Sequence, residues 1–189
     1  MLKSMEEGKV YEVLLVTSSN VTPVGVIRKG GTLRFKLFPG KGFKDILKNS
    51  KASIQATNNV EFIVRAALNF PLEAEFKGRD GFRWIKGLPG HYGRVEYRVS
   101  KWKDEVGESR ILLGTFIPVG RIPGSLPPIP PSRADCTLLE MAVHFTRFLL
   151  SRDAGTSGLI KALYCEYTRL GGHSEIAKYI VKNLGHDSR

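Results

Sequence analysis

Residues 37–46 read Leu37-Phe-Pro-Gly-Lys-Gly-Phe-Lys-Asp-Ile46 and join the end of a strand pattern to the start of a helix pattern. Phe43, Ile46 and Leu47 follow one another at i, i+3 and i+4, which is the spacing of an apolar helical face. The stretch therefore predicts a strand, a glycine-rich turn and a short helix over 43–49.

The same turn has the composition of a phosphate-binding loop. Gly40 and Gly42 leave backbone N–H groups accessible, Lys41 and Lys44 supply ammonium groups, and a helix N-terminus favours negative charge. An ordinary strand-turn-helix with solvated lysines explains the same residues, and no complete P-loop or dinucleotide fingerprint is present. Both interpretations stay open at this point.

Three strand patterns lead up to this turn. Residues 10–17 are rich in β-branched and aromatic side chains and end in a polar cluster, and 23–27 and 32–37 form two further short strands. Gly30 and Gly31 between the last two strands suit a hairpin turn. The opening of the chain therefore predicts an antiparallel meander.

Strand and helix patterns alternate again after the turn. Residues 52–57 read as a strand, and a helix is expected over 60–68 because its apolar residues share one face. The region 71–120 is rich in strand patterns, of which 95–99 and 111–119 are the clearest. We therefore expect a mainly β domain over 1–122.

A helical tail follows a proline-rich connector. The connector spans 123–131, and the subdomain over 132–189 is expected to contain about three helices. The first helix carries an apolar stripe that we expect to cover the barrel or a partner subunit, and two further helices are predicted over about 157–170 and 174–184. The stripe consists of Leu138, Ala142, Phe145 and Leu149.

Composition excludes several classes of protein. The chain has 189 residues, of which 42% are hydrophobic, and its two cysteines do not form a disulfide or zinc pattern. The N-terminus lacks the apolar stretch of a signal peptide, and no stretch is long and apolar enough to span a membrane. We therefore expect a cytoplasmic protein without a membrane partner.

The chain is basic, but its charge is spread out. The formal net charge is +11, yet the cations alternate with apolar residues and form no basic run, so a nucleic-acid partner is not predicted. The histidines lie far apart along the chain without carboxylates or thiolates at ligand spacing, so no metal site is predicted either. Glu140, His144 and Arg147 share one helical face and are interpreted as helix-stabilising neighbours.

The order of these segments resembles an archaeal-type family of unknown function within the flavin-reductase-like, FMN-binding split-barrel superfamily. The resemblance rests mainly on Asn20-Val-Thr-Pro-Val-Gly-Val26, on residues 37–46, and on the segment 52–68. Tyr11-Glu-Val-Leu14, Glu140-Met-Ala-Val-His-Phe-Thr-Arg147 and Arg169-Leu-Gly-Gly-His-Ser-Glu175 add to it. It implies an α+β fold that is mainly β, namely a split β-barrel with a helical tail, which binds FMN and forms a homodimer.

The resemblance also implies which residues hold the cofactor. The isoalloxazine ring would lie against two segments, and the phosphate would lie on the glycine-rich turn. These residues are Asn20, Thr22, Pro23, Val24, Gly25, Thr57, Asn58 and Asn59 for the ring, and Gly40, Lys41, Gly42, Phe43 and Lys44 for the phosphate. The family often has Gly-Ser-x-Thr-Tyr at this turn, so lysines would replace hydroxyl groups as phosphate ligands here.

Two functions fit these expectations. One is a flavin-dependent oxidoreductase or flavin reductase that takes hydride from a reduced nicotinamide or another small redox substrate. The other is a non-enzymatic binding module, either a flavin carrier or a basic barrel that binds RNA. The sequence names no catalytic residue, because the flavin itself carries the redox chemistry.

Overall fold

The structure, a computed structural model, describes residues 2, 5, 7, 10–104, 107–124 and 133–185. The chain forms two compact units, which are described separately. The first unit comprises Met1–Thr57 and Glu73–Pro127, and the second comprises Asn58–Leu72 and Pro128–Arg189. The connector predicted over 123–131 lies outside the described residues from 125 onward.

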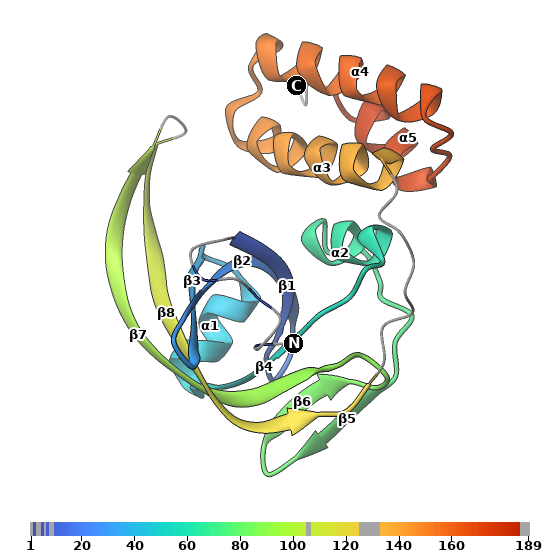
Figure 1. Cartoon of the computed structure of the whole chain (residues 1–189). Coiled ribbons are helices and arrows are strands. Elements are labelled where there is room, and N and C mark those ends of the chain that lie inside the picture. Colours follow the sequence, from blue (N-terminus) through green and yellow to red (C-terminus); the bar gives the residue numbers. More distant parts are fainter. Residues whose placement is uncertain are drawn as a thin grey trace. The chain divides into compact units, whose positions relative to one another are not determined.

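The first unit contains a closed barrel of six antiparallel strands in the order β1-β2-β3-β8-β7-β4 (Figure 1). The strands are β1 Val10–Val16, β2 Val21–Lys29, β3 Thr32–Leu37, β4 Lys51–Gln55, β7 Gly90–Asp104 and β8 Gly107–Ile122. β1, β2 and β3 form the predicted meander, and β3 has its predicted bounds. β7 and β8 are the longest of these strands and form a curved hairpin in Figure 1.

Alternate residues of the strands fill the interior of the barrel. Val13 and Leu15 of β1 and Leu33 and Phe35 of β3 belong to one buried core cluster. The short helix α1, Lys41–Lys48, begins two residues before the predicted start and adds Phe43 and Ile46 to this cluster. Burying a side chain of this size contributes about 1.5–3 kcal/mol, so these anchors fix the glycine-rich turn to the barrel.

A small hairpin of β5 (Phe76–Arg79) and β6 (Phe82–Ile85) is joined to β4 through one glutamine. Gln55 is fully buried, and its Nε2 donates to the carbonyls of Ile85 and Leu88 at 2.9 and 2.7 Å. The N–H of Ile85 donates to Gln55 Oε1 at 2.7 Å. The predicted strand 52–57 therefore ends at Gln55, whose side chain bonds the hairpin backbone.

The second unit consists of helices. They are α2 Val60–Ala67, α3 Arg133–Ser151, α4 Ala154–Arg169 and α5 Glu175–Lys182. The segment 58–72, which the sequence grouped with residues 1–122, belongs to this unit. The physical reason is that Val64 of α2 is completely buried in one core cluster with Met141, Phe145 and Ile180.

The apolar stripe predicted on α3 is buried at three of its four positions. These residues share a core cluster with residues of α2, α4 and α5, whereas the sequence predicted that they cover the barrel or a partner subunit. Leu138, Ala142 and Phe145 are buried, whereas Leu149 is 41% exposed. The buried face is centred on Met141 and Phe145, so Leu149, in the last turn of the helix, lies at the edge of that face.

The ends of α4 and α5 follow capping rules. α4 begins at Ala154, before the predicted start, because the Asp153 side chain accepts a hydrogen bond from the N–H of Thr156. Gly171 follows α4 with a φ of 85°, which is the left-handed conformation predicted for a C-terminal glycine. Ser174 caps α5 in the predicted position.

Candidate functional site

The start of α1 has no side-chain cap. Gly40 occupies the cap position, and the first helical hydrogen bond runs from the N–H of Lys44 to the Gly40 carbonyl at 3.1 Å. Among the described residues, no side chain accepts a hydrogen bond at this cap. The N–H groups of Lys41, Gly42 and Phe43 therefore remain available, as in the first turn of any uncapped helix.

Positive charge surrounds these N–H groups. The first turn of α1 contains no acidic residue, and both Lys41 and Lys44 are exposed. The helix dipole adds a partial positive charge at the same end. The start of α1 is therefore suited to an anion.

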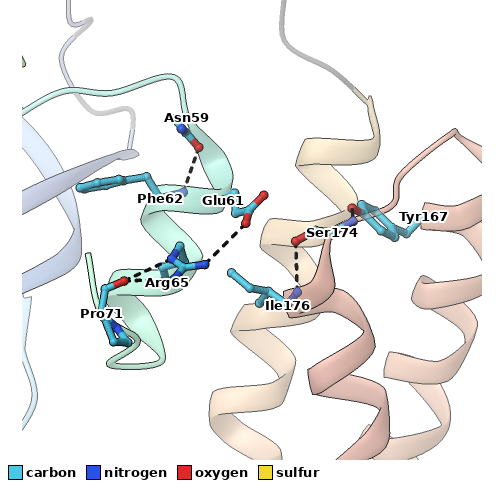
Figure 2. Close-up of polar contacts among 8 residues, drawn as sticks. All are labelled: Asn59, Glu61, Phe62, Arg65, Pro71, Tyr167, Ser174 and Ile176. Carbon is cyan, nitrogen blue, oxygen red and sulfur yellow. Dashed lines mark hydrogen bonds and ion pairs between the residues drawn. The ribbon is translucent and has the colours of Figure 1, made fainter. Parts of the chain in front are cut away.

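Two helices of the second unit, α2 and α5, begin differently (Figure 2). The side chain of Asn59 accepts from the N–H of Phe62 at 2.9 Å and caps α2. The Ser174 hydroxyl accepts from the N–H of Ile176 at 3.2 Å and caps α5. In α2 and α5 the side chain of the cap residue accepts a hydrogen bond from a first-turn N–H group. The first-turn N–H groups of α1 have no such acceptor among the described residues.

The turn between β1 and β2 is fastened to α1 by a single carboxylate. Asp45 Oδ2 accepts hydrogen bonds from the Thr17 hydroxyl at 2.7 Å, and from the N–H and hydroxyl of Ser19, both at 2.8 Å. Burial tends to raise the pKa of Asp45, but hydrogen bonds from Thr17, Ser19 and Ser18 outweigh it and hold the pKa below its ordinary value. The carboxylate therefore stays ionised and holds the turn in place.

Directly after this turn, two predicted residues meet the start of α1. Asn20 Nδ2 donates to Thr22 Oγ1 at 2.9 Å. A Cβ atom added to Gly42 would lie 2.7 Å from Thr22 Oγ1, so the backbone of α1 packs closely against the threonine. Because Thr22 Oγ1 accepts from Asn20, its own hydrogen can be donated to a ligand.

Other predicted residues face elsewhere. Val24 and Phe43 are 5% and 7% exposed and belong to the barrel core, so their side chains contribute packing. Pro23 and Gly25 pair with Leu14 and Glu12 of β1, and they point away from the core because strand residues alternate.

The third predicted segment follows β4. β4 runs from Lys51, beside the turn after β1, towards Gln55, so Thr57 follows the opposite end of that strand. Asn58 and Asn59 belong to the second unit, where Asn59 is the cap of α2. The structure thus brings together Asn20, Thr22 and the residues that open α1.

No sequence pattern indicated a role for Asp45 or Arg83. Asp45 binds Ser19 across 26 positions of the chain. The Arg83 guanidinium lies 3.6 Å from the centroid of the Phe76 ring, and its buried Nη1 has no hydrogen-bond partner among the described residues. Burial lowers the pKa of Arg83, and the charge of Asp45 opposes that shift. In the sequence, the polar run 17–20 indicates the turn that Asp45 binds, but it does not indicate Asp45 itself.

The described ranges contain neither a metal-binding cluster nor a membrane-spanning helix. No group of three or more histidine, cysteine, aspartate or glutamate side chains in them could hold a metal ion. Their helices are too short or too polar to cross a lipid bilayer.

The barrel, its long hairpin and the appended helices define a split barrel with a helical subdomain. Residues 11–109 match the family described as "Protein of unknown function (DUF447) N-terminal domain", and the chain belongs to this family. The resemblance and the fold expected from the sequence are both confirmed.

Two solved structures are similar. An FMN-bound protein of the same family from Methanosarcina mazei has a TM-score of 0.71 and 21% identity, with 94% of this chain and 93% of that chain covered. The styrene monooxygenase flavin reductase from Pseudomonas putida S12 has a TM-score of 0.41 and 13% identity, over 64% of this chain and 80% of that chain. The search of curated proteins found no match.

Proposed function

We propose that the protein is an FMN-binding flavoprotein whose cofactor phosphate lies at the start of α1. The observation that carries the proposal is the uncapped, basic N-terminus of this helix, with N–H groups available beside two lysines. The similar protein from Methanosarcina mazei is FMN-bound, which supports a flavin as the anion. Bound FMN would supply the redox chemistry, and the chain would supply placement and charge.

The residues at this site fit a phosphate. The backbone N–H groups of Lys41, Gly42 and Phe43 would donate to its oxygens, and the Thr22 hydroxyl would donate from the side. Lys41 and Lys44 would neutralise its charge. Each such hydrogen bond to a charged group contributes roughly 1.5–3 kcal/mol.

Asp45 would act as a positioning residue. It holds the turn between β1 and β2, and through that turn it sets Asn20 and Thr22 against Gly42. Its own charge is engaged by three hydrogen bonds, and the positive charge of Arg83 offsets it further. The ionised carboxylate has no hydrogen to donate to a phosphate, so it orders the site without binding the ligand.

We further propose that the flavoprotein is an oxidoreductase or flavin reductase, in which a donor such as a reduced nicotinamide gives a hydride to the flavin and is itself oxidised. The cytoplasm is the proposed compartment, since Cys136 and Cys165 are both free and exposed.

A homodimer is proposed as the working form. Val95 of β7 is 2% exposed, but Tyr97 and Val99, on the same side of that strand, are 40% and 36% exposed. A second copy packed against this side would cover both residues, and two-fold dimers are the commonest soluble oligomers. Light scattering should give twice the mass of one chain, and a single-chain mass with flavin bound would contradict the dimer.

The proposed function is tested by the colour and bleaching of the purified protein. Protein saturated with FMN should be yellow, and anaerobic NADH or NADPH should bleach it. Yellow protein that no nicotinamide bleaches would support a flavin carrier. Protein that stays colourless with added FMN and binds RNA with a steep salt dependence would replace the flavin proposal by the RNA-binding alternative.

A further inference from the structure

A concave surface lies on the outer side of the barrel, and it is bordered by Phe38, two residues before the Gly40 cap of α1. An open pocket of about 860 Å³ is lined by residues of β1, β2, β3, β7 and β8, including Arg34, Lys36 and Arg98. Pockets for small molecules commonly have volumes of roughly 300–1,000 Å³. The volume therefore suits one small molecule.

Strand register places the three cations on one face. Arg34 of β3 lies opposite Thr115 of β8, and Lys36 lies opposite Leu113. Leu113 in turn lies opposite Arg98 of β7. Because directly opposite residues of antiparallel strands point to the same side of the sheet, Arg34, Lys36 and Arg98 all project around Leu113.

These cations are poorly neutralised. Among the described residues, neither Arg34 nor Arg98 forms an ion pair or hydrogen bond, and Lys36 Nζ lies 3.8 Å from the centroid of the Trp102 ring. Glu96, opposite Thr115, is the one acidic residue of the pocket lining. Three cations against one carboxylate leave the pocket with a net positive charge that favours an anion.

Exposed apolar side chains border the same cations. Val10, Ile27 and Phe38 line the pocket and are 64%, 40% and 49% exposed. These exposed apolar side chains lie next to the basic side chains of the same pocket. The combination suits a ligand with one planar apolar part and one anionic part.

We infer that this pocket binds a nucleotide, with its phosphates on Arg34, Lys36 and Arg98 and its base against Phe38 and Ile27. Gly25 also lines the pocket and belongs to the segment expected beside the flavin ring. A nucleotide there would therefore lie close to that segment. Because Gly25 and Phe38 both belong to segments expected to hold FMN, the nucleotide must be tested on protein that is already saturated with FMN.

The test is calorimetric titration of FMN-saturated protein with ADP, adenosine, inorganic phosphate and NAD⁺, the oxidised nicotinamide that cannot reduce the flavin. ADP should bind at least tenfold more tightly than adenosine or phosphate, because both parts of the pocket contribute. Arg98→Ala should weaken ADP and NAD⁺ tenfold or more and leave adenosine unchanged, whereas Phe38→Ala should weaken all three nucleoside ligands. Circular dichroism confirms that each variant is folded.

Arg110→Ala is the matched control. It removes the same charge from the same hairpin, but Arg110 lies on the other face, the side of Tyr97 and Val99, and does not line the pocket. Because that side is proposed to face a second copy, light scattering must show that the variant keeps the mass of the parent. It should leave ADP affinity within twofold of the parent.

Several results would overturn the inference. ADP that fails to bind at millimolar concentration, or an equal loss in Arg98→Ala and Arg110→Ala, would do so. A pocket that binds only RNA would also overturn it, as would a dimer that Phe38→Ala dissociates. If Arg98→Ala weakens FMN as strongly as ADP while Lys41→Ala does not, the pocket holds the flavin, and the phosphate site proposed at α1 fails with it.

Discussion

The starts of α1 and α2 show two ways in which a chain satisfies the same backbone groups. α2 begins with Asn59, whose side chain accepts from a first-turn N–H group, and Glu61 follows in its first turn. α1 begins with Gly40, which has no side chain, and its first turn carries lysine and no acid. A capped helix is complete by itself, whereas α1 needs an acceptor from outside the helix.

The largest expected effect comes from closing the space between α1 and β2. In Gly42→Val the new side chain must displace Thr22, since a Cβ alone would lie 2.7 Å from Thr22 Oγ1. FMN affinity should fall by about a hundredfold, which corresponds to roughly 2.7 kcal/mol. Flavin fluorescence titration measures it.

Gly31→Val is the control for this substitution. Gly31 lies in a β2–β3 turn with no atom near an added Cβ. Unchanged FMN affinity in Gly42→Val, with folding intact, would show that the phosphate does not approach this backbone.

The next effect concerns Asp45 and depends on pH. Asp45→Asn should lower the free energy of unfolding by roughly 1.5–3 kcal/mol at pH 7, because one carboxylate oxygen accepts three hydrogen bonds. The pKa of Asp45 is lowered in the folded protein. Its stabilisation is therefore present above the unfolded pKa of about 3.9 and is lost as the pH falls through the folded pKa.

Urea unfolding of parent and variant at several pH values checks this. The difference between them should be constant near neutral pH and should shrink below about pH 4. A difference that persists unchanged at pH 2 would mean that the charge of Asp45 has no part in holding the turn.

Removing either lysine should have a moderate effect. Lys41→Ala and Lys44→Ala should each weaken FMN by about tenfold, the equivalent of roughly 1.4 kcal/mol, and riboflavin should bind as in the parent. Lys48→Ala, in the last turn of the same helix, is the matched control. An equal loss of affinity for FMN and for riboflavin would mean that the lysine does not act on the phosphate.

The smallest effect is expected where a cap already exists. Asn59→Ala and Ser174→Ala each remove one capping acceptor and should lower the free energy of unfolding by about 1 kcal/mol. Thermal unfolding measures the loss. Neither variant should alter FMN affinity. A tenfold loss of FMN affinity in either variant would contradict the claim that the uncapped helix α1, and not the capped helices, binds the phosphate.

Local pattern was sufficient to predict much of the barrel, and long-range contacts account for what it missed. β3 and α1 were predictable because turns and apolar spacing lie within a few residues of each other. Gln55 bonds Ile85 across 30 positions, and no short-range pattern signals that contact. The assignment of 58–72 to the second unit likewise depends on the burial of Val64 by helices far along the chain.

The candidate site was predictable to a similar degree. Gly40, Gly42 and the two lysines follow from local composition, and strand alternation explains why Val24 faces the core. The contact of Thr22 with Gly42 required the three-dimensional packing of β2 on α1. Asp45 was missed because its partners lie in another turn of the chain.

The most direct test of the central claim is to give α1 the cap that it lacks. A side chain at Gly40 meets no atom within 4 Å and its φ of 171° is accessible to any residue, so Gly40→Asp and Gly40→Ala should both fold. In Gly40→Asp the carboxylate would occupy the first-turn N–H groups. The free energy of unfolding should then stay level or rise by a few tenths of a kcal/mol, while FMN affinity falls by about a hundredfold. Gly40→Ala should bind FMN within about threefold of the parent, and riboflavin should bind all three proteins alike. FMN bound by Gly40→Asp as tightly as by the parent would contradict the placement of the phosphate at this helix.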